Sequence, residues 1–250
     1  MVDSLLLLIT FAFLLAGFIK GVLGLGLPTV AMGLLAVTMP PGRALAIVIV
    51  PAIITNVWQT FVGPYLRDIL RRLWPLLIGT AAGIWLNGGA LTGPYARYTA
   101  IVLGGLLAIN AIIGLSKLNF TVSSRNEKWV GGIVGVVTGM ISAASGVQVI
   151  PSVPYLQAIG MEKEELIQAL GVFFTVATLA LGFNLTSEGL LTSATALPGA
   201  VAMVSSFIGM FVGQAVRTRL RPDIFRIWFQ IGMIVLGVYL AGNALLKLTT

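Results

Sequence analysis

The residues that could act on a ligand gather at two breaks in long apolar stretches of the chain. The first break, residues 17–29, reads GFIKGVLGLGLPT and holds one charge, Lys20. The second, residues 135–148, reads GVVTGMISAASGVQ and is followed by Pro151 and Pro154. Broken apolar segments at matching places in two halves of a chain are typical of a transporter's binding site. In lipid an unpaired backbone group is costly, so each break is expected to be buried in protein or to line a cavity.

Lys20 is the one charge deep in an apolar stretch. A lysine at that depth is costly and is usually functional. The alternative is a lysine near the end of its span that extends to the membrane surface. If Lys20 faces the break, it and the N-terminal ends of the half-helices form a positive site. Free backbone N–H groups at Gly24, Gly26, Ser145 and Gly146 would then favour an anion.

Small and polar residues at the breaks and inside the spans complete the candidate site. The predicted substrate-binding residues are Lys20, Gly24, Gly26, Pro28, Thr29, Asn56, Ser142, Ser145, Gly146, Gln148 and Thr175. If the site lies away from the breaks, the stretches with Asn56 and Gln59 and with Thr175 and Thr178 are the next candidates, since they occupy comparable spans of the two halves. Asn110 and Asn243 are expected to form hydrogen bonds between helices.

The residue types exclude most catalytic chemistry. The chain has no His and no Cys, and every Asp and Glu lies in a loop or at the end of a span. Metal binding, general acid–base catalysis and carboxylate proton relays therefore lack their usual groups inside the membrane. The sequence indicates a protein that is not an enzyme and that needs no metal or cofactor.

Composition indicates a multi-pass membrane protein. Of the 250 residues, 58% are hydrophobic and 9% are charged, whereas a soluble domain carries about 25% charge. The net charge of +7 comes from basic residues at the ends of apolar spans, where topology rather than nucleic-acid binding explains them. The N-terminus lacks the basic segment of a cleaved signal peptide, so we expect it to be retained as the first span.

The apolar pattern predicts an all-α fold with two repeats, each of four full transmembrane helices and one short or re-entrant segment. The repeats cover residues 1–116 and 129–250, and a cytoplasmic linker covers 117–128. The predicted full spans are residues 4–22, 44–62, 73–90, 97–115, 129–144, 166–185, 190–216 and 227–246, and the short segments are 25–39 and 147–159.

Three sets of glycines support the duplication. They match in the same order in both halves: Gly17 and Gly21 with Gly135 and Gly139, Gly79 and Gly83 with Gly209 and Gly213, and Gly104 with Gly237. The Gly79 and Gly209 pairs are expected to bring helices close together.

Basic loops predict the orientation. The loops at 67–72, 117–128 and 217–226 are rich in Lys and Arg, and such loops stay in the cytoplasm. This assignment makes the halves inverted and places both termini outside. Parallel halves would instead put the arginines of the 217–226 loop outside.

The breaks resemble the TauE/SafE-type sulfite exporter family of bacterial transporters. The resemblance rests on Gly24-Leu25-Gly26-Leu27-Pro28 and on Ser145-Gly146-Val147, which Pro151 follows, and it extends over nearly the whole chain. Both copies carry fewer glycines than the family pattern. The resemblance implies export of sulfite or of a related sulfonate or oxyanion across the bacterial inner (plasma) membrane.

We therefore expect a transporter that binds a small anion near the midplane of the lipid bilayer, where the two breaks meet. The alternatives are an anion channel, or a membrane subunit of a larger complex that does not itself transport. Nucleic acid is not an expected partner, and a homodimer is compatible with this interpretation.

The predicted topology can be tested with cysteines introduced at Ser4 and Ser124, because the chain contains no Cys. An impermeant thiol reagent added to intact cells should label Ser4→Cys and leave Ser124→Cys unlabelled. Labelling of both positions, or of Ser124→Cys alone, would contradict inverted halves.

Overall fold

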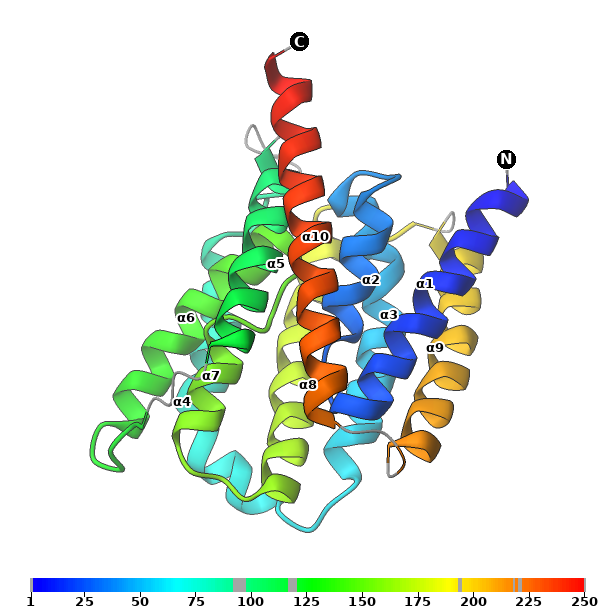
Figure 1. The fold of residues 1–250 in the computed structure, drawn as a ribbon. Helices are drawn as coiled ribbons and strands as arrows, with labels where there is room; N and C mark the ends of the chain where they lie inside the picture. The colour runs from blue at the N-terminus through cyan, green and yellow to red at the C-terminus, as the bar shows by residue number, and fades with distance from the viewer. Residues whose placement is uncertain are drawn as a thin grey trace.

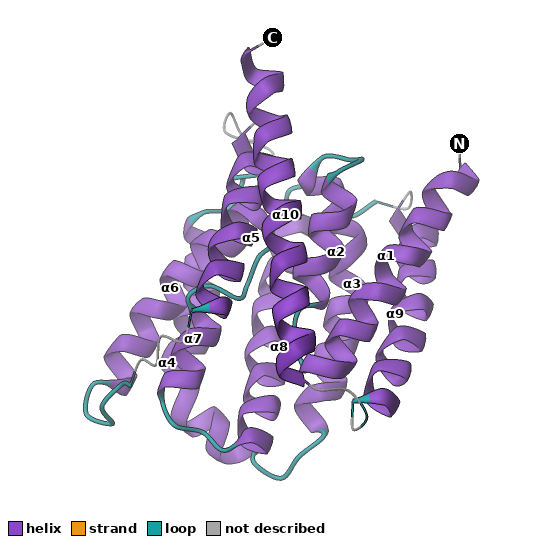
Figure 2. Cartoon of the chain, viewed as in Figure 1, coloured by secondary structure: helices purple, strands orange, loops and turns teal. Residues whose placement is uncertain are grey.

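The protein is a bundle of α-helices. The computed structural model describes residues 2–91, 98–116, 121–192, 195–217, 219 and 222–249. Within these residues the chain forms helices joined by loops and turns (Figure 2). The helices are α1 (Val2–Leu23), α2 (Leu27–Ala36), α3 (Pro41–Phe61), α4 (Leu66–Leu86), α5 (Thr99–Leu115), α6 (Glu127–Ser145), α7 (Ser152–Ala158), α8 (Lys163–Ser187), α9 (Ala196–Val216) and α10 (Pro222–Thr249).

Seven of these helices contain a segment long and apolar enough to cross a membrane, and α2 and α5 are shorter apolar helices. The multi-pass all-helical fold expected from the sequence is confirmed. Several boundaries differ from the prediction by a few residues, and the starts of α4 and α9 differ most. Helix α4 begins at Leu66 rather than at residue 73, because its first turns carry the basic loop at 67–72. Helix α9 begins at Ala196 rather than at residue 190.

Helices from the two halves of the chain pair with one another. Helix α1 packs along α9, and α6 packs along α4 in the same way. Helices α3 and α8 pair with each other, as do α5 and α10. If α1–α5 are matched in order to α6–α10, the contact of α1 with α9 corresponds to that of α6 with α4. The contacts of α3 with α8 and of α5 with α10 each join two matched helices. The paired contacts thus have the symmetry expected of a duplicated chain.

The matching glycines lie at the crossings between halves. A Cβ atom at Gly17 would lie 2.2 Å from the carbonyl oxygen of Ser206 on α9, and one at Gly135 would lie 2.3 Å from that of Leu76 on α4. Gly104 and Gly237 face each other, since a Cβ on either would lie 2.5 Å from the other's carbonyl oxygen. Only a residue without a side chain allows the backbones to approach so closely.

The direction of each helix is visible in Figure 1. Helices α1, α3 and α5 run from the end of the molecule that holds both termini, whereas α6, α8 and α10 run toward it. The start of α4, the start of α6 and the end of α9 lie together at the opposite end, and they carry Arg71, Lys128 and Arg217. The topology prediction also used Arg97, Lys117 and Arg221, which lie outside the described residues.

An ion-pair cluster ties α4 and α6 to α8 at the end of the molecule that holds the basic loops. The Arg72 guanidinium contacts both carboxylate oxygens of Glu127, at 2.6 and 3.0 Å, and donates a hydrogen bond to the carbonyl of Ile159 at 2.6 Å. Glu165 at the start of α8 lies 3.8 Å from the same guanidinium. This cluster fixes the short α7 segment between α6 and α8.

Substituting the crossing glycines should destabilise the protein to a similar extent in the two halves. In Gly17→Leu and in Gly135→Leu the new side chain meets a backbone carbonyl, so both should lower the midpoint of thermal unfolding. Overpacking of this kind costs ~1–3 kcal/mol. Gly105→Leu is the matched control, because nothing lies within 4 Å of a Cβ there. A Gly17→Leu protein as stable as Gly105→Leu would contradict the close crossing.

Candidate functional site

The first break is a short left-handed turn between α1 and α2. Gly24 and Gly26 have φ values of 77° and 101°, a region that favours glycine. The Gly24 amide donates to the carbonyl of Lys20 at 2.7 Å and so closes the last turn of α1. Pro28 lies in the first turn of α2, where its missing N–H leaves no helical hydrogen bond unmade.

Lys20 points into the protein one turn before this break. Its residue is only 4% exposed. Its Nζ donates hydrogen bonds to the hydroxyl oxygen of Thr55, at 3.2 Å, and to Oδ1 of Asn56. Both partners are fully buried on α3. In this structure the Lys20 side chain therefore lies inside the helix bundle and not on its surface.

Among the described side chains, Lys20 has no acidic partner for its charge. The two ion pairs found between described residues both involve Arg72, at one end of the bundle. The lysine is held by neutral oxygens alone, although buried charges in proteins are generally paired. The Nδ2 atom of Asn56, beside Lys20, is also buried and has no hydrogen-bond partner. A positive charge and an unused N–H donor thus lie together next to the first break.

Gln59 holds the first break against α3 and α8. Its Nε2 donates to the carbonyls of Gly24, at 2.9 Å, and Ile167, at 2.8 Å. Gln168 on α8 does the reverse, since its Nε2 donates to the carbonyls of Thr60, at 2.9 Å, and Gly63, at 2.8 Å. The two glutamines supply backbone carbonyls near the break with the hydrogen bonds that they need inside an apolar bundle.

Thr175 on α8 forms another contact between α3 and α8. Its hydroxyl and that of Thr60 lie 2.9 Å apart and share a hydrogen bond. The hydroxyl of Thr178 bonds back to the carbonyl of Phe174 on its own helix. Within the described residues, no hydrogen bond connects either threonine to Lys20. The Asn56 stretch is therefore part of the Lys20 cluster, and the Thr175 stretch is part of the contact between α3 and α8.

Serines organise the second break. The Ser145 hydroxyl donates to the carbonyl of Ile141 at 2.7 Å and accepts the Val147 amide at 3.1 Å. The Ser142 hydroxyl donates to the carbonyl of Thr138 at 2.6 Å and lies 3.2 Å from that of Val147. Gly146 ends α6 with a φ of 73°. The serine side chains of this break thus form hydrogen bonds with backbone groups of the same segment.

The prediction of free amides at the breaks named Gly24, Gly26, Ser145 and Gly146, and it is wrong for Gly24 and Gly146. The Gly24 and Gly146 amides were expected to be free to bind an anion. Each instead closes the last turn of its helix, Gly24 on the carbonyl of Lys20 and Gly146 on that of Ser142 at 2.8 Å. A left-handed glycine after a helix commonly directs its N–H back in this way. The Gly24 amide is therefore not available to a ligand at the first break.

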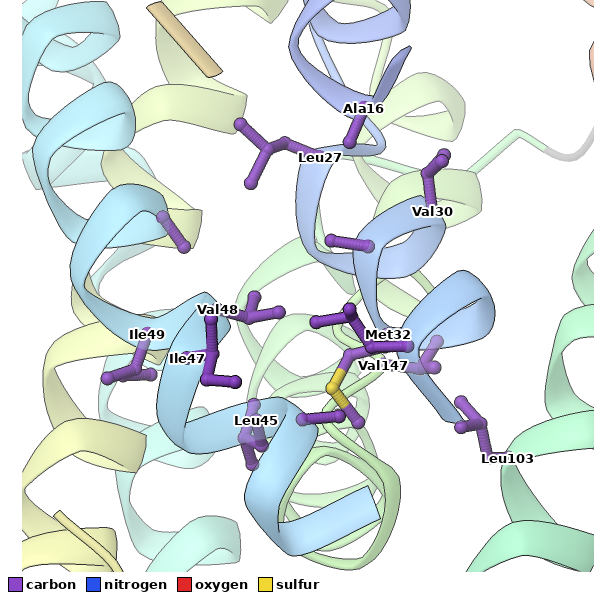
Figure 3. Packing of buried hydrophobic residues seen from close by; sticks show 14 of the residues in the cluster. Ala16, Leu27, Val30, Met32, Leu45, Ile47, Val48, Ile49, Leu103 and Val147 are labelled. Atoms are coloured by element: carbon purple, nitrogen blue, oxygen red, sulfur yellow. The ribbon is translucent and has the colours of Figure 1, made fainter. Parts of the chain in front are cut away.

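The two breaks have different surroundings. Gly146 lies against α2 and α3, because a Cβ there would be 3.1 Å from Met32 and 3.0 Å from Leu45. Figure 3 shows Val147 beside Met32 in this apolar cluster. Among the described residues, no hydrogen bond links residues 24–29 to residues 142–148. Each region does contain a buried, unpartnered oxygen, the Thr29 hydroxyl and Oε1 of Gln148.

The described side chains include no group of three His, Cys, Asp or Glu residues that could hold a metal ion. Asp68, Glu127, Glu164 and Glu165 lie in the first turns of helices, and Glu188 follows the last turn of α8. Among the described residues buried inside the bundle, the polar groups near the breaks are the Lys20 ammonium, amides and hydroxyls, which suit the binding of an anion through charge and N–H or O–H donors.

Comparison with known proteins gives one family. Residues 9–240 match the family model described as sulfite exporter TauE/SafE. No curated protein and no solved structure matches the chain.

Replacing Gln59 should loosen the first break. Gln59→Leu leaves the carbonyls of Gly24 and Ile167 without their donor, and an unsatisfied buried group costs about 1–3 kcal/mol. The thermal unfolding midpoint should fall accordingly. Gln214→Leu, at an exposed position on α9, is the matched control and should unfold near the wild-type temperature. Equal midpoints for the two variants would show that the Gln59 bonds do not stabilise the break.

Proposed function

We propose that this chain, which belongs to the TauE/SafE sulfite exporter family, exports a small anion that binds beside Lys20, Thr55 and Asn56. The family match spans residues 9–240, and it makes the protein a multi-pass membrane exporter of the sulfite exporter type. The position of the site and the identity of the anion are the two parts of the proposal.

The observation that carries the proposal is the buried charge of Lys20 without a carboxylate. Removing a charge from water costs several kcal/mol unless a partner compensates for it. Thr55 and Asn56 offer only neutral oxygens to the ammonium group. An anion at this position would supply the missing opposite charge, and the low dielectric of the bundle would strengthen the attraction.

The donors around Lys20 favour an anion with several oxygen acceptors. An ammonium group has three hydrogens, and two of its directions are used by Thr55 and Asn56. The remaining N–H of Lys20 and the unpartnered Nδ2 of Asn56 can each donate to a different oxygen of one ligand. Sulfite and organosulfonates have that arrangement of oxygens, and both are substrate classes implied by the family.

The charge belongs to one half of the chain only. Lys20 directly precedes Gly21 on α1, and its counterpart before Gly139 on α6 is Thr138. Thr138 is buried and donates to the carbonyl of its own helix at Val134. The duplicated frame therefore has one cationic position rather than two, which fits a single site for one anion.

We further propose that the two halves are inverted repeats in the bacterial inner membrane, with both termini outside. The opposite directions of the matched helices in Figure 1 support this arrangement. The basic residues at the start of α4, the start of α6 and the end of α9 favour a cytoplasmic position for that end of the bundle.

The substitution Lys20→Met tests whether Lys20 binds the anion or only stabilises the fold. Sulfite should raise the unfolding temperature of the wild-type protein, because a ligand that binds the folded state stabilises it. In Lys20→Met the dissociation constant should rise about tenfold or more, since a charged hydrogen bond contributes ~1.5–3 kcal/mol. Without ligand the variant should be at least as stable as the wild type, because an apolar side chain replaces a buried, uncompensated charge.

The matched control is Lys163→Met, at an exposed position in the first turn of α8. It should leave both the sulfite affinity and uptake into proteoliposomes unchanged. An affinity within about threefold of wild type in Lys20→Met would place the site elsewhere. Saturable uptake with counterflow is expected for a transporter, and ohmic single-channel currents would instead identify a channel.

A further inference from the structure

An apolar groove runs along the outer face of the α4–α6 pair, away from the Lys20 cluster. It encloses about 740 Å³. Gly79 and Ala82 of α4 and Gly132 of α6 line it, and because these residues are small the surface is hollowed where the two helices meet. Ile78 and Ile133 also line it, and both are largely exposed.

One end of the groove is basic and aromatic. Lys128, Trp74 and Trp129 line it there. Arg71 is exposed and lies one helical turn before Trp74, on the same face of α4. Neither Lys128 nor Arg71 forms an ion pair among the described residues, because Glu127 is bound to Arg72. The two tryptophans are suited to the boundary between hydrocarbon and headgroups.

The groove is basic at one end and apolar along the rest. It is therefore complementary to an anionic phospholipid, which has a charged headgroup and hydrocarbon chains. A second copy of the chain fits less well. In a twofold dimer with its axis across the membrane, the same patch faces itself at the same depth. Lys128 and Arg71 would then lie against their own copies, and like charges repel.

We propose that the groove is a binding site for an anionic phospholipid. An acyl chain lies in the groove over Gly132 and Ala82, and the phosphate lies at the end that carries Lys128 and Arg71. The inference is independent of the transported anion, because the groove is on the outer face of the bundle.

Native mass spectrometry of the detergent-purified protein tests this site with phosphatidylglycerol and phosphatidylcholine of identical chains. The wild type should bind phosphatidylglycerol more tightly than phosphatidylcholine. Replacing Lys128 and Arg71 by Gln should reduce that preference about fivefold for each residue, the effect expected of one basic residue near an anionic headgroup. Lys163→Gln is the matched control, a basic residue exposed at the start of α8, and should leave the preference unchanged.

A second variant tests the acyl chain. Gly132→Leu should weaken both lipids alike, because the new side chain enters the groove and a Cβ there meets only Pro75, at 3.9 Å. Gly105→Leu, an open glycine on α5, should weaken neither. Equal binding of the two lipids by the wild type, or a preference that survives loss of Lys128 and Arg71, would overturn the proposal. A wild-type dimer that Gly132→Leu dissociates would overturn it too, and would show that a second copy covers the groove.

Discussion

Backbone hydrogen bonding in an apolar environment is the constraint on which the rest of this structure depends. A helix satisfies its own backbone, so both breaks need donors and acceptors from elsewhere. At the second break the solution is local, because Ser142 and Ser145 bond to the turn that contains them. At the first break it is distant, because Gln59 crosses from α3 to the carbonyl of Gly24. The first break is therefore fixed to the helix that also holds the partners of Lys20, and this brings the charge and the turn into one cluster.

Close helix crossings provide the frame for that cluster. Glycines at equivalent positions set α1 against α9 and α6 against α4, and Gly104 and Gly237 set α5 against α10. Because each crossing joins one half of the chain to the other, neither half buries its helices alone. The frame is nearly symmetric, whereas the polar residues inside it are not, as Lys20 and its counterpart Thr138 show. The fold thus depends on the crossing glycines that the two halves share. The proposed anion site depends on Lys20, which has no basic counterpart in the second half.

The sequence predicted the helices well because their signals are local. Apolar length, glycine spacing and the two breaks are each properties of a short stretch, and Lys20 was evident as a lone charge. The contacts of the site are not local. Thr55 and Gln59 reach Lys20 and Gly24 from 35 residues away in the chain, and no pattern within one helix indicates that pairing. The amides of Gly24 and Gly146 were misjudged for a related reason: a glycine-rich stretch indicates a turn, but the φ angles that direct its N–H groups depend on how each helix ends.

The neutral partners of Lys20 have a consequence for the proposed anion site, which would be empty for part of a transport cycle. A lysine bound to a carboxylate would hold its partner tightly, and an anion would have to displace it. A lysine with no partner would be costly to keep charged during the empty step. The interaction of Lys20 with Thr55 and Asn56 is intermediate in strength. Their oxygens partly replace water around the ammonium group and leave one N–H free. At the proposed site, an arriving anion would add a charged interaction without breaking either bond. The same two oxygens would hold Lys20 in place after the anion leaves, so the proposed site would keep its geometry for the next anion.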